Sequence, residues 1–409
     1  MIALARKCRS CGGSDLRPLL AYGEMPLADG LLPSREACQN EPRYPLTLVF
    51  CAECSLVQIV ETVQPETLFC DDYPYFSSFS DQLLEHSRQH AHELIVDEQL
   101  DANSWVVEIA SNDGYLLKNF VDAGIPVTGI DPAEGPAQIA IERGVNTEIQ
   151  FFTEQLAEQY QAAGRQADVI IANNVLAHVA DTNGFVAGLA RLLKHGGVAT
   201  LEFPYLRDLV DHCEFDTIYH EHLCYFSLTA VDRLFRRHGL IIHDVRRLAI
   251  HGGSLRLYAS HARPRSAYVT QMLHNEQRDG LTEYEYYRDF ATRSRAICQR
   301  LRSLLETIRG QGRRVAAYGA AAKGATLLNF ANIGSEFIDF VVDRNTHKHG
   351  RFMPGVHLPI MDVSSLAGQQ PDYALLLAWN FRDEILSQQK SFRDAGGKFI
   401  VPVPDPAIV

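Results

Sequence analysis

The sequence predicts an α/β protein with a small N-terminal zinc-binding domain, a central Rossmann-like domain and a C-terminal Rossmann-like domain. Two pairs of closely spaced cysteines predict the first domain. Two separate runs, in which short apolar stretches alternate with helical patterns, predict the other two. A length of 409 residues suits two or three domains better than one core. The expected divisions are residues 1–75 for the zinc-binding domain, 76–247 for the central domain, 248–312 for a connection made of a strand and helices, and 313–409 for the C-terminal domain.

The composition is that of an average globular protein, and it argues against several functions. Hydrophobic residues make up 46% and charged residues 22% of the chain, and the net charge is −12. A nucleic-acid-binding protein normally carries a basic stripe, so no nucleic acid partner is expected. No apolar run approaches the ~18–20 residues that a membrane-spanning helix needs, and the first residues show no apolar signal segment. We therefore expect a cytoplasmic protein with no membrane partner, and we take a monomer as the expected state.

The first domain is marked by two C-x2-C pairs in a segment rich in glycine and proline. Cys8 and Cys11 form one pair, and Cys51 and Cys54 form the other. Such pairs can converge on one tetrahedral ion, and four thiolate ligands leave no open position, so we expect a structural zinc. Nine cysteines, an odd number, fit reduced thiols better than a disulfide framework. Neither pair opens a helix in a βαβ unit, as a redox dithiol would. Two chance pairs of buried thiols remain the alternative.

The central domain is expected to start with an amphipathic helix over residues 80–100, where apolar residues recur at helical spacing. Short apolar strands then alternate with helical stretches, which predicts a parallel sheet. A further strand and a polar helical region lead into the C-terminal domain, where the alternation returns. The strands are expected at residues 105–109, 127–130, 169–172, 198–203, 254–260, 315–318, 337–342, 373–378 and 398–401, and the polar helical region at residues 268–309.

Residues at the ends of the first central strands indicate a nucleoside-binding edge. The first strand ends at Glu108, and small residues in the turn behind it would let a ligand approach the backbone and the next helix N-terminus. The turn lacks the first two glycines of the dinucleotide fingerprint. The second strand ends at Asp131, whose carboxylate could accept both hydroxyls of a ribose. The candidate cofactor-binding residues are Glu108, Ala110, Asn112, Gly114, Asp131, Asn173 and Asn174.

A dense group of side chains able to transfer protons follows the fourth central strand. The run Tyr219–His222 contains a tyrosine, two histidines and a glutamate, and it lies beyond the carboxyl edge of the expected sheet, where such folds bind ligands. Cys224 stands where a zincin motif would have its second histidine, so a catalytic zinc is not favoured. Together these groups fit acid/base chemistry, with His178 as a further candidate. The alternative is a set of structural histidines.

The C-terminal domain offers a second turn of small residues. Lys323 lies where the first strand of this domain passes into a helix, and the backbone N–H groups and the lysine charge would suit a phosphate. The turn is not a Walker A loop, because Gly324 follows the lysine. Asp343 ends the next strand, and Trp379 and Asn380 end a later one at the same edge. Close packing between helix and strand would also explain the small residues.

Taken in order, these features resemble the zinc-containing sugar C-methyltransferases of deoxysugar biosynthesis, over nearly the whole chain. The resemblance implies an N-terminal zinc domain, a central class I methyltransferase domain that binds S-adenosyl-L-methionine, and a C-terminal Rossmann-like domain. It also implies methylation at C3 of a 4-keto nucleotide-linked deoxysugar, for which we expect dTDP as the nucleotide. Ala110 departs from the glycine more often found in this family. Besides the four cysteines, the motifs that carry the resemblance are Tyr73–Ser78, Glu108–Gly114, Tyr219–His222, His251–Arg256 and Tyr318–Gly324.

The resemblance implies roles for individual residues. The hydrogen on a carbon next to a ketone is weakly acidic, so the site needs a base and a group that stabilises the enolate. His222 is the expected base and Glu221 would orient or polarise it, although the residues alone do not choose between His222 and His220. The groups expected to donate to the developing oxyanion are Tyr75, His178 and Tyr219. The residues expected to bind the sugar nucleotide are Tyr73, Ser77, His251, Ser254, Arg256, Tyr318, Lys323, Asp343, Trp379 and Asn380.

Three other functions remain open from the sequence. An O- or N-methyltransferase is the nearest, because nothing in the sequence proves that carbon is the acceptor. An epimerase or isomerase of keto-sugar nucleotides could use the same base, but it would not need the pair Glu108 and Asp131. A non-enzymatic zinc scaffold would not need the Tyr219–His222 cluster.

Overall fold

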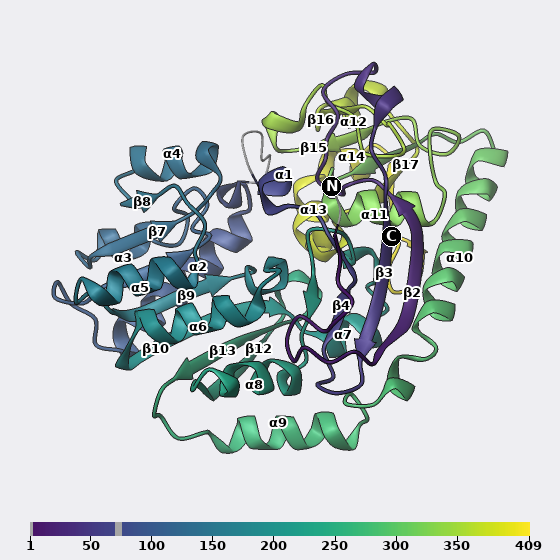
Figure 1. Ribbon diagram of the computed structural model, residues 1–409. Coiled ribbons are helices and arrows are strands. Elements are labelled where there is room, and N and C mark those ends of the chain that lie inside the picture. The colour runs from purple at the N-terminus through teal and green to yellow at the C-terminus, as the bar shows by residue number, and fades with distance from the viewer. Residues whose placement is uncertain (1–2, 70–75) are drawn as a thin grey trace.

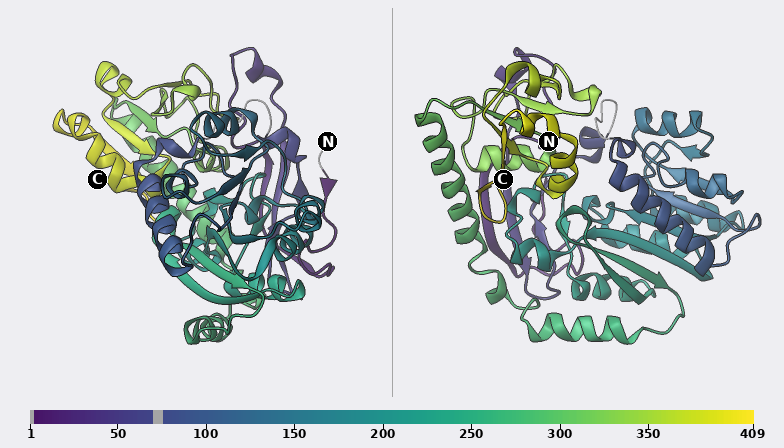
Figure 2. Two further views of the ribbon diagram at one scale, coloured as in Figure 1. Left: turned by 90° about the vertical axis from the view of Figure 1, so that its left-hand side faces the viewer. Right: turned by 180° about the vertical axis from the view of Figure 1, so that it is seen from behind.

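The structure is a computed structural model that describes residues 3–69 and 76–409. Figures 1 and 2 show the central domain beside the C-terminal domain, with two long N-terminal strands and helix α10 (Phe290–Gly310) running alongside the latter. Among the helices of the described residues, none combines the length and the apolar character that crossing a membrane would require.

The N-terminal domain is an antiparallel sheet whose strands the sequence pattern does not predict. Strands β2 (Leu16–Met25), β3 (Tyr44–Cys51) and β4 (Val57–Ile59) pair in that order, and β11 (Cys224–Tyr225) joins the sheet beside β4. The register between β2 and β3 shifts twice, which hides the two-residue periodicity of β2. Because β11 comes from the central domain, the two domains share one sheet. The remaining elements are β1 (Ala3–Leu4), β5 (Glu61–Thr62) and α1 (Pro65–Phe69).

The central domain is a seven-stranded sheet in the order β12–β13–β10–β9–β6–β7–β8. The strands from β10 to β8 in this order are parallel, whereas β13 lies antiparallel between β10 and β12. The sheet is Rossmann-like, as expected, but the expected parallel arrangement is interrupted by the reversed strand β13. The strand expected at residues 254–260 thus belongs to this sheet, not to a connection that begins at residue 248. The strands are β6 (Val106–Ile109), β7 (Val127–Ile130), β8 (Thr147–Glu148), β9 (Ala167–Asn173), β10 (Leu193–Pro204), β12 (Ile241–Leu248) and β13 (Ser254–Ser260).

Helices cover both faces of the central sheet, and alternate strand residues face the two layers. Along β9, Val169 and Ile171 share an apolar cluster with α2 and α3, while Ile170 and Ala172 share one with α5 and α6. Ser80 caps α2 by accepting a hydrogen bond from the N–H group three residues on. The helices are α2 (Asp81–Asp97), α3 (Lys118–Asp122), α4 (Glu134–Glu142), α5 (Glu154–Ala162), α6 (Thr182–Leu192), α7 (Leu206–Asp211) and α8 (Leu228–Arg237).

The polar helical region expected at residues 268–309 forms two helices, α9 (Ala267–Arg278) and α10. The second helix contacts β2 and leads into the C-terminal domain, as Figure 1 shows. The chain thus passes from the central sheet to the C-terminal sheet along the N-terminal one.

The C-terminal domain is a six-stranded sheet in the order β16–β15–β14–β17–β18–β19, parallel except for β19. The strand expected at residues 337–342 is shorter, at 341–343, because the N–H groups of Phe337 and Ile338 donate to the carbonyl of Gly334 in a turn rather than to a neighbouring strand. The strand order reverses between β14 and β17, and such a switch point opens a crevice at the carboxyl ends of the strands. The elements are β14 (Val315–Tyr318), α11 (Ala322–Phe330), β15 (Val341–Asp343), β16 (Ile360–Asp362), α12 (Ser365–Gln369), β17 (Tyr373–Leu376), α13 (Arg382–Gln388), α14 (Lys390–Asp394), β18 (Lys398–Val401) and β19 (Ala407–Ile408).

Candidate active site and metal centre

The four cysteines of the expected zinc site converge in the N-terminal domain. The Sγ atoms of Cys8, Cys11, Cys51 and Cys54 all lie within 4.8 Å of one another. The Sγ–Sγ distance is 3.5 Å between Cys8 and Cys54 and 3.6 Å between Cys11 and Cys51. These distances are close to the ~3.8 Å edge of a tetrahedron with Zn–S bonds of ~2.3 Å. The prediction of a four-cysteine metal site is therefore confirmed, and the closed thiolate set fits a structural zinc.

The turn between the first two cysteines is bound by the central domain. The side-chain amide of Asn183 donates to the carbonyl oxygens of Arg9 (2.9 Å) and Ser10 (3.0 Å). Thr182 Oγ1 donates to the Arg9 carbonyl (3.0 Å), and Arg237 donates to that of Ser10 (2.8 Å). Because Thr182 and Asn183 start α6 and Arg237 ends α8, the metal turn is fixed to helices that cover the central sheet.

The turn after β6 has the backbone geometry expected of a cofactor-binding turn. Ala110, Asn112 and Gly114 have φ angles of 55°, 49° and 75°, in the left-handed region that favours glycine. A Cβ atom at Gly114 would lie 2.9 Å from the side chain of Val145, so only glycine fits there. Ala110 adopts the same backbone region at a cost of about 1–2 kcal/mol relative to a right-handed conformation.

Asp131 holds this turn and keeps acceptor capacity for a ligand. Its Oδ2 accepts the N–H of Asn112 (2.8 Å), and its Oδ1 accepts the N–H of Ala133 (2.8 Å). Each carboxylate oxygen has two lone pairs, so one on each oxygen remains for a hydroxyl. Burial raises the pKa of Asp131, and hydrogen bonds from the hydroxyl groups of a ligand would lower that pKa again.

Two further buried oxygens at the same sheet edge have no hydrogen-bond partner among the described residues, namely Glu108 Oε2 and Asn173 Oδ1. Burial and two neighbouring aspartates raise the pKa of Glu108 well above its usual range. Because buried polar atoms are normally hydrogen-bonded, these unsatisfied atoms fit the hydroxyl and amine donors of an adenosyl cofactor. Asn174 has φ 55° and donates its N–H to the carbonyl of Glu202 (2.7 Å), so it shapes the turn after β9.

His222 lies in a cluster with Tyr219 and His178. Its Nδ1 is 2.9 Å from the carbonyl oxygen of Thr217, and its Nε2 is 3.1 Å from the hydroxyl of Tyr219. The rings of Tyr219 and His222 stack with centroids 4.1 Å apart, and the ring of His178 meets His222 edge-on at 4.7 Å. Since a carbonyl only accepts, Nδ1 carries the hydrogen and Nε2 carries the lone pair. Burial lowers the pKa of His178 to about 4, so that imidazole is neutral near pH 7 and can donate.

The side chains of His220 and Glu221 both contact the N-terminal domain. His220 Nε2 lies 3.0 Å from the carbonyl oxygen of Pro45. Glu221 is buried, and its Oε1 accepts the N–H of Asp29 (3.0 Å). Its Oε2 has no hydrogen-bond partner within the described parts of the chain. Burial and the nearby Asp29 raise the pKa of Glu221 to about 8, so the group is a neutral acid at pH 7.

The residues expected to bind the sugar nucleotide from the central domain have different surroundings. Ser77 is buried and donates its N–H to the side chain of Asn112 (2.8 Å), next to the cofactor turn. Arg256 is buried in the sheet and pairs with Glu202 (2.6 Å), which does not favour contact with a substrate. Ser254 Oγ donates to the carbonyl of Ile250. Tyr73 and Tyr75 lie outside the described residues, and His251 is described only as part of the 3₁₀ turn at residues 250–252.

In the C-terminal domain, the small residues meet the neighbouring strand. A Cβ atom at Gly319 would lie 2.8 Å from Ala378, and one at Gly324 would lie 2.6 Å from Leu377, so close packing explains both glycines. Tyr318 packs in the sheet core and accepts from Gln389, a placement that does not favour substrate contact. At the carboxyl edge, Asp343 accepts the N–H groups of Ala320 (2.7 Å) and Asn345 (2.8 Å), and Asn380 is half-buried in the 3₁₀ turn η8 (Trp379–Phe381).

Lys323 and Trp379 face the central domain. The Lys323 Nζ lies 4.5 Å from the centroid of the Trp379 indole, whose N–H donates to Asp216 (2.6 Å). Asp216, Thr217 and Asp29 are residues that the motifs alone do not single out. The sequence around Asp216 is polar and carries no pattern that would have drawn attention to it.

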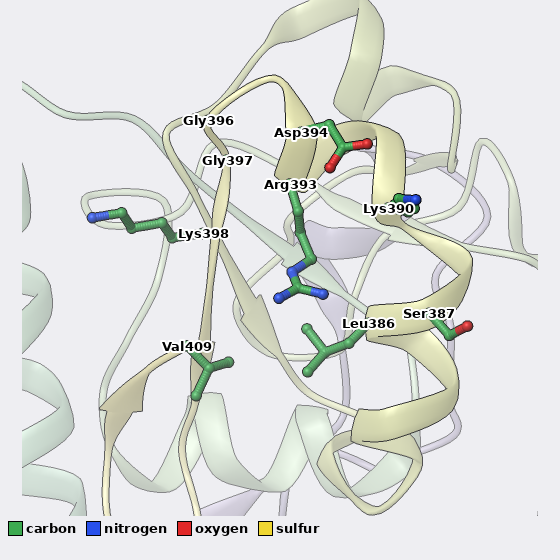
Figure 3. Close-up of a pocket in the computed structure, with 9 residues that line it drawn as sticks. All are labelled: Leu386, Ser387, Lys390, Arg393, Asp394, Gly396, Gly397, Lys398 and Val409. Atoms are coloured by element: carbon green, nitrogen blue, oxygen red, sulfur yellow. The ribbon is translucent and has the colours of Figure 1, made fainter.

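A pocket of about 520 Å³ lies elsewhere on the C-terminal domain. Figure 3 shows the side chains of Leu386, Arg393 and Val409 pointing toward one another there. Lys398, which starts β18, also lines it, so the pocket is at the amino end of that strand. Ligands of open α/β sheets bind at the carboxyl ends, so this pocket is not part of the candidate active site.

Comparison with known proteins divides the chain in a similar way. Three family descriptions match: "Putative zinc binding domain" over residues 8–69, "Methyltransferase domain" over 84–245 and "C-methyltransferase C-terminal domain" over 249–404. C-methyltransferase NovU of Streptomyces niveus is 36% identical over 409 residues, which cover 98% of this chain and 96% of NovU. A ubiquinone biosynthesis O-methyltransferase of Agrobacterium fabrum is 35% identical over 97 residues, 23% of this chain and 38% of that protein. Among solved structures, magnesium protoporphyrin IX methyltransferase of Synechocystis PCC 6803 with bound SAH has a TM-score of 0.36 and 17% identity, covering 44% of this chain and 83% of that one.

Loss of the metal should unfold the N-terminal domain, because the four thiolates join the segment before β2 to the turn between β3 and β4. Elemental analysis should find about one zinc per chain. Cys51→Ser should lower both the zinc content and the unfolding temperature. Cys38→Ser is the matched control, since that thiol lies outside the cluster. A Cys51→Ser protein with unchanged stability would contradict a structural role.

Asp131→Ala should weaken binding of S-adenosylmethionine by about 1.5–3 kcal/mol, the usual value of a hydrogen bond to a charged group. Isothermal titration calorimetry measures the change directly. Asp122→Ala, which removes an exposed carboxylate at the end of α3, should leave the affinity unchanged. Equal affinity in wild type and Asp131→Ala would remove this carboxylate from the ribose site.

Proposed function

The chain belongs to the C-methyltransferase family that includes NovU of Streptomyces niveus, and we propose that it methylates C3 of a nucleotide-linked 4-keto deoxysugar, with dTDP as the nucleotide. Methyl transfer from S-adenosylmethionine and a structural zinc follow from the family and the two sites described above. The observation that carries the proposal is the fixed imidazole of His222 beside the hydroxyl of Tyr219. The neutral carboxyl group of Glu221 belongs to the residue just before His222.

A carbon acceptor has no lone pair and must lose a proton before it can attack a methyl group, whereas an oxygen or nitrogen acceptor already carries a lone pair. When bound, S-adenosylmethionine supplies an electrophilic methyl group, but a sugar carbon becomes a nucleophile only after it loses a proton. A ketone next to that carbon makes the proton removable, because the resulting charge moves onto oxygen. The site must therefore combine a proton acceptor with donors for an oxyanion.

His222 meets the requirement for the acceptor. The Thr217 carbonyl takes the hydrogen of Nδ1, so the lone pair of Nε2 can accept the substrate proton. The hydroxyl of Tyr219 lies 3.1 Å from Nε2 and holds that nitrogen in place until the substrate arrives. The ring of His222 lies against Tyr219 and His178, whereas His220 contacts the Pro45 carbonyl of the N-terminal domain, and this placement favours His222 over His220 as the base.

Four groups are proposed to donate to the developing oxyanion, namely Glu221, His178, Tyr219 and Tyr75. Glu221 is protonated at neutral pH because burial raises its pKa to about 8, and its Oε2 has no competing partner among the described residues. The neutral imidazole of His178 and the phenol of Tyr219 both contact the ring of His222. A buried neutral acid donates strongly to an oxyanion without a charge of its own that would repel it. Tyr75 keeps the same proposed role.

The C-terminal domain would hold the nucleotide. Its switch point between β14 and β17 is the place where open α/β sheets bind nucleotides, and the N-terminus of α11 there suits a pyrophosphate. Asp343 and Asn380 lie at this edge and remain the proposed contacts to the sugar nucleotide, together with Lys323 in the first turn of α11. An O- or N-methyltransferase would not remove a C–H proton from the acceptor, and an epimerase would leave the product mass unchanged.

The proposal predicts that the enzyme moves a labelled methyl group onto carbon. Incubation with methyl-¹³C S-adenosylmethionine and a panel of dTDP-linked keto sugars should give a product in which NMR places the label on C3. His222→Ala should lose about 10²–10⁴-fold in kcat, the usual contribution of a general base. It should also abolish exchange of the acceptor C–H with deuterated solvent, while S-adenosylmethionine affinity stays unchanged.

His220→Gln is the matched control, and it should keep the exchange because its side chain contacts Pro45 rather than the cluster. Exchange at the wild-type rate in His222→Ala would assign the base to another group. A label on oxygen or nitrogen would replace C-methylation of this substrate class by one of the alternatives.

A donor role for Glu221 predicts a pH dependence. The acid form is complete below pH ~7 and is lost as the pH rises through about 8, so kcat should fall above that value. Glu221→Gln, whose amide donates at every pH, should retain part of the activity and lose this alkaline decrease. Glu214 has its pKa raised to a similar value by burial, so Glu214→Gln serves as the control and should keep the decrease. An alkaline decrease that persists in Glu221→Gln would contradict the donor role.

A further inference from the structure

The 3₁₀ turn η4 (Phe215–Thr217), just before the Tyr219–His222 cluster, is where all three domains meet. All three of its residues are buried. From the N-terminal domain, the hydroxyl of Tyr22 donates to the carbonyl oxygen of Phe215 (2.7 Å). From the C-terminal domain, Phe330 at the end of α11 packs against both rings, with centroids 4.7 Å from Tyr22 and 5.6 Å from Phe215. The turn is therefore held by contacts from outside its own domain.

Asp216 makes the polar contact between this turn and the C-terminal domain. Its side chain is completely buried, and its Oδ2 accepts the indole N–H of Trp379 at 2.6 Å. The pKa of Asp216 is raised to about 6 by burial, so the group is ionised near pH 7 and the hydrogen bond is charge-assisted.

The ammonium group of Lys323 lies 4.5 Å from the centroid of the same indole, and its charge attracts Asp216 and Glu214. Two residues of the C-terminal domain, one at η8 and one on α11, thus hold a single buried carboxylate of the central domain.

The residue after Asp216 orients the proposed base. The Thr217 carbonyl accepts the Nδ1 hydrogen of His222 at 2.9 Å. Thr217 itself is fixed by its N–H and hydroxyl, which both donate to the carbonyl of Glu214 (3.1 and 2.8 Å). A displacement of Asp216 would therefore turn the peptide group that decides which nitrogen of His222 carries the hydrogen.

We propose that Asp216, Trp379 and Lys323 are positioning residues, through which docking of the C-terminal domain fixes His222 in the tautomer with an unprotonated Nε2. The proposal rests on the proposed function, in which that nitrogen takes the substrate proton. It assigns the C-terminal domain a part in preparing the base, in addition to holding the nucleotide. Contacts that served only to hold the domains together would not determine which ring nitrogen of His222 carries the hydrogen.

Nitrogen-15 NMR of the histidine-labelled, substrate-free full-length protein tests the proposal, with His222→Ala identifying the His222 signals. In wild type, Nδ1 should give the signal of a protonated ring nitrogen and Nε2 that of an unprotonated one. Trp379→Phe removes the indole N–H but keeps an aromatic ring for Lys323, and it should give averaged His222 signals from two tautomers. It should also lower kcat by roughly 10- to 100-fold, the usual effect of losing a group that orients a reactive imidazole, with the KM for S-adenosylmethionine unchanged.

Asp216→Asn keeps a side-chain oxygen for the indole and should retain the wild-type His222 signals, whereas Asp216→Ala should not. Trp105→Phe is the matched control: it removes the other indole of the chain, whose N–H donates to Thr128 (3.0 Å) in the central domain. Wild-type His222 signals in both Trp379→Phe and Asp216→Ala would overturn the proposal, and so would equal averaging in Trp105→Phe.

These outcomes are separate from those that test the proposed function. If His222→Ala retained C–H exchange, His222 would not be the base, but its NMR signals would still report whether Trp379 positions it. If Trp379 served only to bind the sugar nucleotide, Trp379→Phe would raise the KM for that substrate and leave the His222 signals of the free protein unchanged.

Discussion

Hydrogen bonds from three domains converge on one segment, residues 215–226, and the reactive part of the structure depends on them. The N-terminal domain contributes the Pro45 carbonyl and the Asp29 N–H, as well as the pairing of β4 with β11. The C-terminal domain contributes the indole of Trp379. The central domain contributes the Ala177 carbonyl, which accepts the N–H of Leu223. No regular helix or long strand holds this segment, so its shape is set by partners that are distant in sequence.

The stretch from Glu214 to His222, which overlaps this segment, also concentrates buried ionisable groups. Burial raises the pKa of Glu214 and Glu221 to about 8 and that of Asp216 to about 6. Removing a carboxyl group from water destabilises its charged form, and an apolar side chain would avoid that cost. Several such groups within eight residues, beside two imidazoles, are typical of a functional site rather than of a core. The fold tolerates them because the acid forms are neutral and the ionised Asp216 has a donor.

Features that depend on local sequence were predictable, and features that depend on distant contacts were not. The ends of β7, β13, β14 and β18 agree with the expected strands, because each is a short apolar run between turn residues. The cysteine site followed from ligand spacing alone. By contrast, the bulged strand β2 has no clear periodicity, and β13 could be assigned to the central sheet only from its pairing. In the site, the sequence does not distinguish His220 from His222 as the base. The structure separates them, because His220 contacts the Pro45 carbonyl and His222 contacts the Thr217 carbonyl.

The shared sheet has a consequence for exchanging parts between related enzymes. Strand β11 continues directly from the Tyr219–His222 cluster and completes the sheet that carries the zinc ligands, since it pairs with β4 just after Cys54. A chimera that took its first 70 residues from a relative would bring a foreign strand against β11, and any mismatch in register would reach the cluster within two residues. Recombination at the start of the C-terminal domain faces a different constraint, because the graft must supply a tryptophan and a lysine for Asp216. The natural unit for transplanting specificity in this fold is therefore the C-terminal domain together with residues 215–226.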